Sequence, residues 1–147
     1  MVRRDNKSLN ELLVTLFNSI MTTETKAVIT EEFKDISHND MHIIEAIGIE
    51  EPRKMSDIAK RLGVTVGTLT TNMNSLEKKD YVVRERSESD KRVVFVKLTQ
   101  FGRKAFFHHR DFHKKMIKSV VMEFTPEEQE VLMRCLTKLN DFFVNYE

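Results

Sequence analysis

The segment from Ser56 to Lys79 reads SDIAKRLGVTVGTLTTNMNSLEKK, and it decides the fold. We expect Ser56 to cap a short helix over residues 57–62, which ends at Gly63, and Thr65 to cap the following helix. The apolar residues of that second helix recur at helical spacing, as Val66, Leu69, Met73 and Leu76. Two helices joined across this turn predict a helix-turn-helix.

An alternating pattern replaces the helical one after this motif. Residues 81–86 and 92–98 are rich in Val, Phe and Arg, and they flank a polar segment at residues 87–91. Two such strands predict a β-hairpin, which makes residues of about 37–99 a winged helix-turn-helix. The expected fold class is therefore mainly α with a small β-hairpin wing.

Amphipathic helices are expected on both sides of the winged module. The first covers residues of about 5–31, a second begins after Ser37, and a long one begins after Thr99, with Gly102 as an expected weak point. The sequence Thr125-Pro126-Glu127-Glu128 fits the start of a last helix. Thr can cap a helix, Pro suits its first position, and Glu completes a capping box.

These flanking helices predict a dimer. They are too apolar for monomer surfaces, and the last one ends in Phe142, Phe143 and Tyr146. We expect a single domain over residues 1–147, in which helices at about 5–31 and 99–146 form a two-fold homodimer. Such a dimer places two recognition helices about 34 Å apart, one turn of DNA, and predicts a pseudopalindromic operator.

Composition bounds the possible functions. The chain has 147 residues, of which 32% are charged and 40% are apolar. This length and composition fit one soluble globular domain. No apolar run approaches the roughly 18–20 residues of a membrane span, and the single cysteine, Cys135, favours a reducing compartment, so we expect a cytoplasmic protein. The net charge is only +1, but residues 53–103 hold twelve Lys and Arg against six Asp and Glu. This basic segment between acidic flanks favours phosphate binding.

Polar residues of the second motif helix and of the wing are the candidates for DNA contact. Thr and Asn are poor helix formers, so their abundance opposite the apolar face favours a role in contacting bases and phosphates over simple solvation. In the wing, basic side chains can reach a minor groove, and Asp90 is expected to orient Arg92 by a salt bridge. The candidates are Thr65, Gly67, Thr68, Thr71, Asn72, Asn74, Ser75, Lys78, Arg84, Arg86, Asp90, Lys91 and Arg92.

Two other classes of protein compete with this interpretation. The chain has no Gly-rich phosphate loop, no Ser/His/Asp order and no supported Cys/His pair, so we expect neither an enzyme nor a cofactor. A winged module that contacts only protein remains an alternative. Such a module would tolerate loss of Arg92 without loss of DNA affinity.

The order of these motifs resembles the MarR family of winged-helix regulators. Ser89-Asp90-Lys91-Arg92 runs into Leu98-Thr99-Gln100-Phe101-Gly102-Arg103, which matches the family's Asp-x-Arg wing followed by Leu-Thr-x-x-Gly-Arg. Phe33-Lys34-Asp35-Ile36-Ser37 and Val66-Gly67-Thr68-Leu69-Thr70-Thr71 are similar to the FabT branch of that family. The resemblance implies a repressor of fatty-acid and membrane-lipid synthesis genes, with long-chain acyl-acyl carrier protein as corepressor.

The resemblance also implies a pocket for the acyl tail between the winged module and the dimer helices. Large, flexible apolar side chains near that junction are the candidates for effector binding, because they can fill a cavity and yield to a ligand. They are Phe17, Ile20, Met21, Met41 and Ile44. Ordinary core packing explains the same residues nearly as well.

A zinc-responsive repressor is the alternative within the same family. His109 and His113 lie four residues apart, and His42 and Glu24 precede them, as a set of plausible zinc ligands. The zinc-sensing AdcR type of this family is similar at these positions. Polar residues at an interhelical junction explain the set at least as well, so we expect no bound metal.

Overall fold

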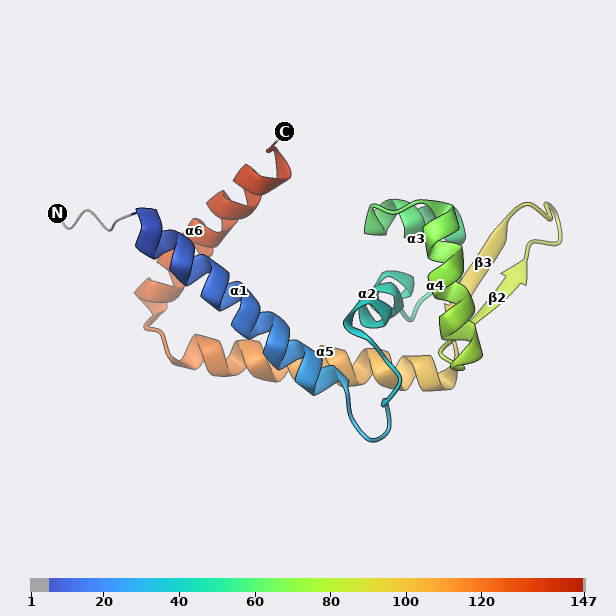
Figure 1. The fold of residues 1–147 in the computed structure, drawn as a ribbon, viewed down its shortest axis with the longest axis horizontal. Helices are drawn as coiled ribbons and strands as arrows, with labels where there is room; N and C mark the ends of the chain where they lie inside the picture. The colour runs from blue at the N-terminus through green and yellow to red at the C-terminus, as the bar shows by residue number, and fades with distance from the viewer. Residues whose placement is uncertain (1–5, 147) are drawn as a thin grey trace. The chain divides into compact units, whose positions relative to one another are not determined.

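The computed structural model describes residues 6–146, and the chain forms two compact units, Met1–Arg110 and Asp111–Glu147. The first unit contains α1 (Asn6–Val28), α2 (His38–Ile47), β1 (Arg53–Lys54), α3 (Met55–Leu62), α4 (Val66–Lys78), β2 (Val82–Arg86), β3 (Val94–Leu98) and the beginning of α5 (Gln100–Met122) (Figure 1). The remainder of α5 and α6 (Pro126–Val144) belong to the second unit.

The core of the first unit lies among α2, α3, α4 and the sheet. Its fully buried side chains include Ile43, Ile44, Ile47, Ile58, Leu69, Met73, Leu76, Tyr81 and Val96. The apolar stripe predicted for α4 is buried from Leu69 onward, but Val66 at its start is 47% exposed. The prediction was wrong for Val66, because this first residue of α4 lines a cleft beside the wing instead of the core.

Local capping signals set three of the helix starts, as predicted. Ser37 and Asp40 form a capping box, in which each side chain accepts a hydrogen bond from the other's backbone N–H (3.0 and 2.9 Å). Thr65 accepts from the backbone N–H three residues on (3.1 Å). Thr125 and Glu128 form a second capping box, with Pro at the start of α6. These side chains satisfy backbone donors that a helix start leaves unpaired.

The start of α3 differs from the prediction. The helix begins at Met55 with Lys54 in the N-cap position, so Ser56 lies inside the helix and does not cap it. A short strand that periodicity did not indicate explains the shift: β1 pairs antiparallel with β3, with Arg53 opposite Val96, and the chain enters α3 directly from it.

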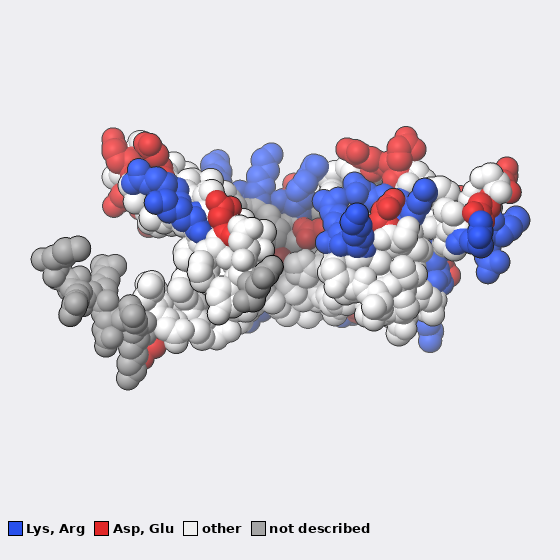
Figure 2. Space-filling model, turned by 90° about the horizontal axis from the view of Figure 1, so that it is seen from above, with Lys and Arg blue, Asp and Glu red and all other residues white. Residues whose placement is uncertain are grey.

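The predicted hairpin is confirmed. β2 and β3 pair antiparallel, from Val82 opposite Leu98 to Arg86 opposite Val94, and the order of the three-stranded sheet is β1-β3-β2. The hairpin extends away from the helices as a wing (Figure 1). Both basic and acidic side chains are gathered at its tip (Figure 2).

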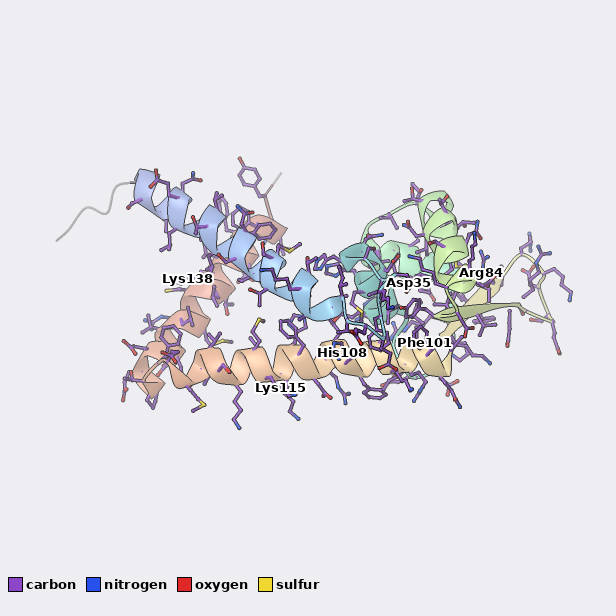
Figure 3. The ribbon with its side chains drawn as sticks, turned by 60° about the horizontal axis from the view of Figure 1, so that its bottom comes forward. Asp35, Arg84, Phe101, His108, Lys115 and Lys138 are labelled. Carbon is purple, nitrogen blue, oxygen red and sulfur yellow. The ribbon has the colours of Figure 1, made fainter. Side chains whose placement is uncertain are left out.

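Gly102 lies where α5 closely approaches the backbone before β2. A Cβ at this position would come within 2.0 Å of the Tyr81 carbonyl oxygen. That oxygen accepts from the Thr99 N–H (3.0 Å), and the Thr99 hydroxyl accepts from the Gly102 N–H (3.0 Å). Phe101, labelled in Figure 3, stacks on the Tyr81 ring with centroids 4.8 Å apart. Glycine is therefore needed for packing here, which corrects the expectation of a mere weak point.

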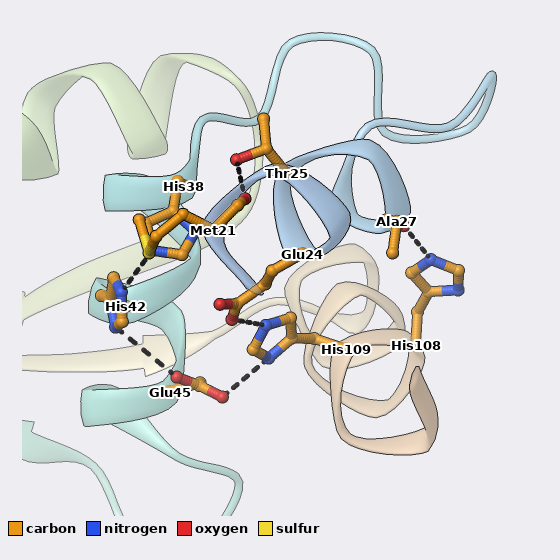
Figure 4. Close-up of polar contacts among 9 residues, drawn as sticks. All are labelled: Met21, Glu24, Thr25, Ala27, His38, His42, Glu45, His108 and His109. Atoms are coloured by element: carbon orange, nitrogen blue, oxygen red, sulfur yellow. Dashed lines mark hydrogen bonds and ion pairs between the residues drawn. The ribbon is translucent and has the colours of Figure 1, made fainter. Parts of the chain in front are cut away.

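A charged cluster lies where α1, α2 and α5 meet in the first unit (Figure 4), with Glu24 and His109 buried and Glu45 partly exposed. His109 is 2% exposed, and its Nε2 lies 2.8 Å from Glu24 Oε1 while its Nδ1 lies 2.7 Å from Glu45 Oε1. Glu45 Oε2 lies 3.8 Å from His42 Nδ1, and His42 Nε2 lies 2.8 Å from His38 Nε2. Both nitrogen atoms of the His109 ring thus face carboxylates.

Apolar side chains are exposed on the flanking helices. On α1, Leu12 is 60% and Phe17 64% exposed, and in the second unit Phe143 on α6 is 64% exposed. No residue of α6 is buried. Within the part of the chain that is described, no helix has the length and apolar character needed to cross a membrane.

We predict that Gly102→Ala destabilises the protein. The added methyl group would overlap backbone atoms that cannot rotate away, so α5 must shift, at a cost of about 1–3 kcal/mol in the free energy of unfolding. Urea unfolding of the two proteins measures this difference. Gly67→Ala is the matched control, because a Cβ there would lie 3.9 Å from Thr65 Oγ1, an ordinary van der Waals contact. Equal stability of Gly102→Ala and the wild type would refute the packing argument.

We also predict a pH-dependent loss of stability in His109→Gln. Burial lowers the pKa of His109, but hydrogen bonding to Glu45 and Glu24 and their charges raise it, and the net pKa lies above the usual 6.5. A raised folded-state pKa contributes stability that is fully present below the unfolded pKa and is lost as pH rises through the folded pKa.

The stability gap between wild type and His109→Gln should therefore be largest near pH 6, about 3 kcal/mol, and should shrink on the alkaline side. Urea unfolding of both proteins between about pH 6 and pH 9 measures the gap. A gap that widens as the pH rises would show that His109 is buried in its neutral form.

Candidate nucleic-acid interface

The outer face of α4 is polar and exposed. Leu69, Met73 and Leu76 are fully buried, so the opposite side of this helix faces away from the core. Of the candidates on α4, Asn72 is half-buried at the edge of this face. The others are exposed, as expected: Gly67, Thr68, Thr71, Asn74, Ser75 and Lys78.

The threonine hydroxyls of this helix are partly engaged within it. Thr70 donates to the Val66 carbonyl oxygen (2.8 Å), and Thr71 donates to the Gly67 carbonyl oxygen (3.4 Å). Thr65, the N-cap, donates its hydroxyl hydrogen toward the hydroxyl of Thr68 (3.0 Å). A threonine whose hydroxyl donates to a backbone carbonyl of its own helix can still accept a hydrogen bond at its oxygen, and its methyl group can make an apolar contact.

Arg84 and Asn74 are bonded to each other. From β2, Arg84 donates through Nη2 to Asn74 Oδ1 on α4 (2.7 Å). The same guanidinium forms a fork with Glu77, through Nε to Oε2 (3.1 Å) and Nη2 to Oε1 (3.2 Å). The hydrogen bond from Arg84 holds the pKa of Glu77 below its usual range, although burial opposes it. The position of the Arg84 side chain (Figure 3) is thus set by α4.

The expected salt bridge at the wing tip is confirmed. Arg92 donates through Nε to Asp90 Oδ1 (3.1 Å) and through Nη2 to Oδ2 (3.2 Å), and its backbone N–H also donates to Oδ1 (3.0 Å). The side-chain hydrogen bond from Arg92 holds the pKa of Asp90 below its usual range. The Arg92 side chain is 91% exposed, and Arg86 and Lys91 are exposed beside it. An arginine fixed in direction but open to solvent is suited to bind an anion.

A cleft of about 490 Å³ separates α4 from the wing. Arg84 and Arg92 line it on the side of the wing, and Thr70 lines it from α4. Lys54 and Ser56 also line this cleft, and they were not among the predicted contacts. Their shared location depends on the pairing of β1 with β3, which the sequence pattern did not indicate.

The five effector candidates lie in two different environments. Met41 and Ile44 on α2 are 2% and 0% exposed and belong to the packed core. Phe17 and Ile20 on α1 are 64% and 41% exposed, and Met21 beside them is half-buried. The candidates thus form an exposed set on α1 and a core set on α2.

The proposed zinc ligands lie mostly within the charged cluster around His109. Glu24 and His109 are in contact, but the second nitrogen of His109 faces Glu45. His42 faces His38 and Glu45, so its nitrogen atoms are engaged away from the Glu24–His109 contact. His113 lies one turn further along α5, in the second unit. In this arrangement the His109 ring lies between two carboxylates, those of Glu24 and Glu45.

Two curated proteins with similar sequences are transcriptional regulators. Transcriptional regulator AdcR of Streptococcus pneumoniae is 31% identical over 107 residues, 71% of this chain and 73% of that protein. An uncharacterized HTH-type transcriptional regulator of Bacillus subtilis, YfiV, is 29% identical over 127 residues, 85% of this chain and 79% of its own length.

A solved structure covers nearly the whole chain. FabT of Streptococcus pneumoniae, in a crystal structure in complex with DNA, superimposes with a TM-score of 0.91 at 38% identity, over 97% of this chain and 100% of that one. The family model described as MarR family matches residues 34–93, which hold α2, the helix-turn-helix, β2 and the loop of the wing. Sequence and structure together show that the chain belongs to the MarR family of transcriptional regulators.

Proposed function

We propose that this protein is a sequence-specific DNA-binding transcriptional repressor, with α4 in the major groove and the wing against the minor groove. The observation that carries the proposal is the Asp90–Arg92 fork, which holds an almost fully exposed guanidinium at the wing tip. A narrow minor groove has a strong negative potential that attracts such a side chain. Similarity to FabT, whose structure was solved in complex with DNA, supports DNA binding.

A homodimer is the second part of the proposal. Exposed apolar side chains would otherwise remain in water, and a second copy of the chain offers the same stripes for mutual burial; they are Leu9, Leu12 and Leu16 on α1 and Phe142 and Phe143 on α6. Two chains then present two α4 helices to successive major grooves on one side of a pseudopalindromic operator.

The third part concerns the regulated genes and the effector. Because 38% identity to FabT extends over almost the full chain, we infer that the protein represses fatty-acid and membrane-lipid synthesis genes. Long-chain acyl-acyl carrier protein would be the corepressor, and the exposed apolar side chains of α1, Phe17 and Ile20, offer surface to its acyl tail. Displacing water from such surface contributes roughly 25 cal/mol per Å².

Zinc control is the competing hypothesis, since Glu24 and His109 are already in contact. Zinc would need to displace Glu45 from one side of His109 or Glu24 from the other, and His42 from its present partners. A metal ion would have to offset the loss of these contacts, and the 38% identity to FabT over 97% of this chain favours the acyl effector.

We predict that Arg92→Ala weakens operator binding by about 1–3 kcal/mol, which is about 5- to 150-fold in Kd. The variant loses the oriented cation but no buried contact, so its unfolding curve should match that of the wild type. Lys104→Ala on α5, which removes a cation paired with Glu32, is the control and should bind as the wild type does.

Fluorescence anisotropy at fixed salt, with a duplex carrying both half-sites, gives the affinities. Sedimentation of the complex should show two chains per duplex. Unchanged affinity in Arg92→Ala would contradict the role assigned to Arg92, and a wild-type protein that binds no duplex would favour a winged module that contacts only protein.

The effector prediction is that long-chain acyl-acyl carrier protein lowers the Kd for the operator by about 5- to 150-fold, the usual range of coupling between two ligands. The same carrier protein without its acyl chain is the control and should have no effect. Zinc is titrated in parallel, with wild type and with His109→Ala. If only zinc strengthens binding, and His109→Ala removes that effect, the metal-sensor hypothesis replaces the lipid one.

A further inference from the structure

We propose that Asn74 is a specificity-determining residue that reads keto bases, guanine or thymine, in the major groove, and that Arg84 fixes its amide in the reading orientation. This inference rests on the proposed DNA binding by α4. It assigns Arg84, a predicted DNA contact, the role of a positioning residue.

The amide orientation follows from the chemistry of the two side chains. An arginine has five N–H donors and no acceptor, so only the carbonyl oxygen of an asparagine can face it. Nη2 of Arg84 lies 2.7 Å from Asn74 Oδ1, which makes this a short, charge-assisted hydrogen bond. The amide nitrogen of Asn74 therefore points away from the guanidinium, with no hydrogen-bond partner among the described residues.

Glu77 holds the guanidinium in that position. It accepts from Nε and Nη2 with both carboxylate oxygens, one helical turn from Asn74 on the same helix. The Arg84 side chain is only 22% exposed, so its direction is set by these contacts. Arg84 in turn compensates the charge of Glu77, which would otherwise stand as a carboxylate beside DNA phosphates.

Asn74 lies on the outer face of α4. At 100° per residue it lies within about 40° of Gly67 and Lys78, on the side away from Leu69 and Leu76. It is exposed, and it lies on the edge of that face nearest the wing, because its partner Arg84 comes from β2. A base edge can therefore meet its free amide hydrogens.

The fixed orientation makes Asn74 a donor. An asparagine that binds adenine uses both ends of its amide, accepting from N6–H and donating to N7. Here the oxygen is held by Arg84, and a base amino group approaching it would meet guanidinium N–H groups, donor against donor. Guanine O6 and thymine O4 present acceptors at the place where adenine and cytosine carry amino groups. Keto bases are thus favoured over amino bases at one position of each half-site.

The test begins with selection of bound duplexes from a random pool by the wild-type protein. Affinities are then measured for duplexes with each of the four base pairs at each half-site position. The wild type should favour keto over amino bases about tenfold at one position, the order of one good hydrogen bond. In Asn74→Ala this preference should fall below about twofold there, while the other positions keep theirs.

Arg84 variants test the positioning role. Arg84→Met keeps the aliphatic stem but removes every donor, so it should reduce the preference at the same position and let adenine bind better. The double variant, Asn74→Ala with Arg84→Met, should keep the same keto-over-amino preference as Asn74→Ala alone, because the two residues act as one unit. If Arg84→Met does not fold, as judged by circular dichroism, Glu77→Gln weakens the fork with less disturbance and should give a smaller shift at the same position.

Lys78→Ala is the control for a residue that contacts a phosphate and no base, and it should weaken binding to all duplexes by the same factor. If Asn74→Ala loses the same affinity for all four base pairs, the Asn74 amide contacts a phosphate in the wild type, and the inference is overturned. Changes at different positions in the Asn74 and Arg84 variants, or a wild-type preference for adenine, would overturn it as well. A wild-type protein that selects no sequence would instead refute the proposed function.

Discussion

The burial of Leu69, Met73 and Leu76 is the constraint on which the reading surface depends. These side chains fix the rotation of α4 about its axis, since turning the helix would place polar groups in the core at a cost of about 1–3 kcal/mol each. The same rotation presents the polar face outward and brings Asn74 and Glu77 within reach of Arg84 on β2. Core packing thus sets the chemistry of the surface.

Side chains of opposite charge then order that surface. Asp90 holds Arg92 and Glu77 holds Arg84, so two of the basic groups beside the cleft are oriented before any ligand is present. Exposed ion pairs contribute little to stability. Their value lies in the entropy that need not be lost on binding, because the arginines already point in one direction.

The parts that sequence analysis predicted have local causes. The capping boxes at Ser37 and Thr125 and the Asp90–Arg92 fork each join residues two or three positions apart, so their spacing is visible in the chain. The missed features join distant residues. The bond between Arg84 and Asn74 requires β2 to pass beside α4, and β1 is two residues long and has no periodicity to detect.

Gly102 shows the same difference between local features and contacts of distant residues. A glycine within a helical pattern indicates a local weakness, whereas its contact with the Tyr81 backbone follows from how α5 leaves the sheet. The charged cluster around His109 also joins residues that are distant in the sequence, because Glu24, Glu45 and His109 come from three helices. Removing these charges from water has a cost that only short, directed contacts offset. Three apolar side chains in place of these residues would avoid that cost, but they would let the helices slide along one another. The two carboxylates, one at each ring nitrogen of His109, hold α1 and α2 in a defined register against α5.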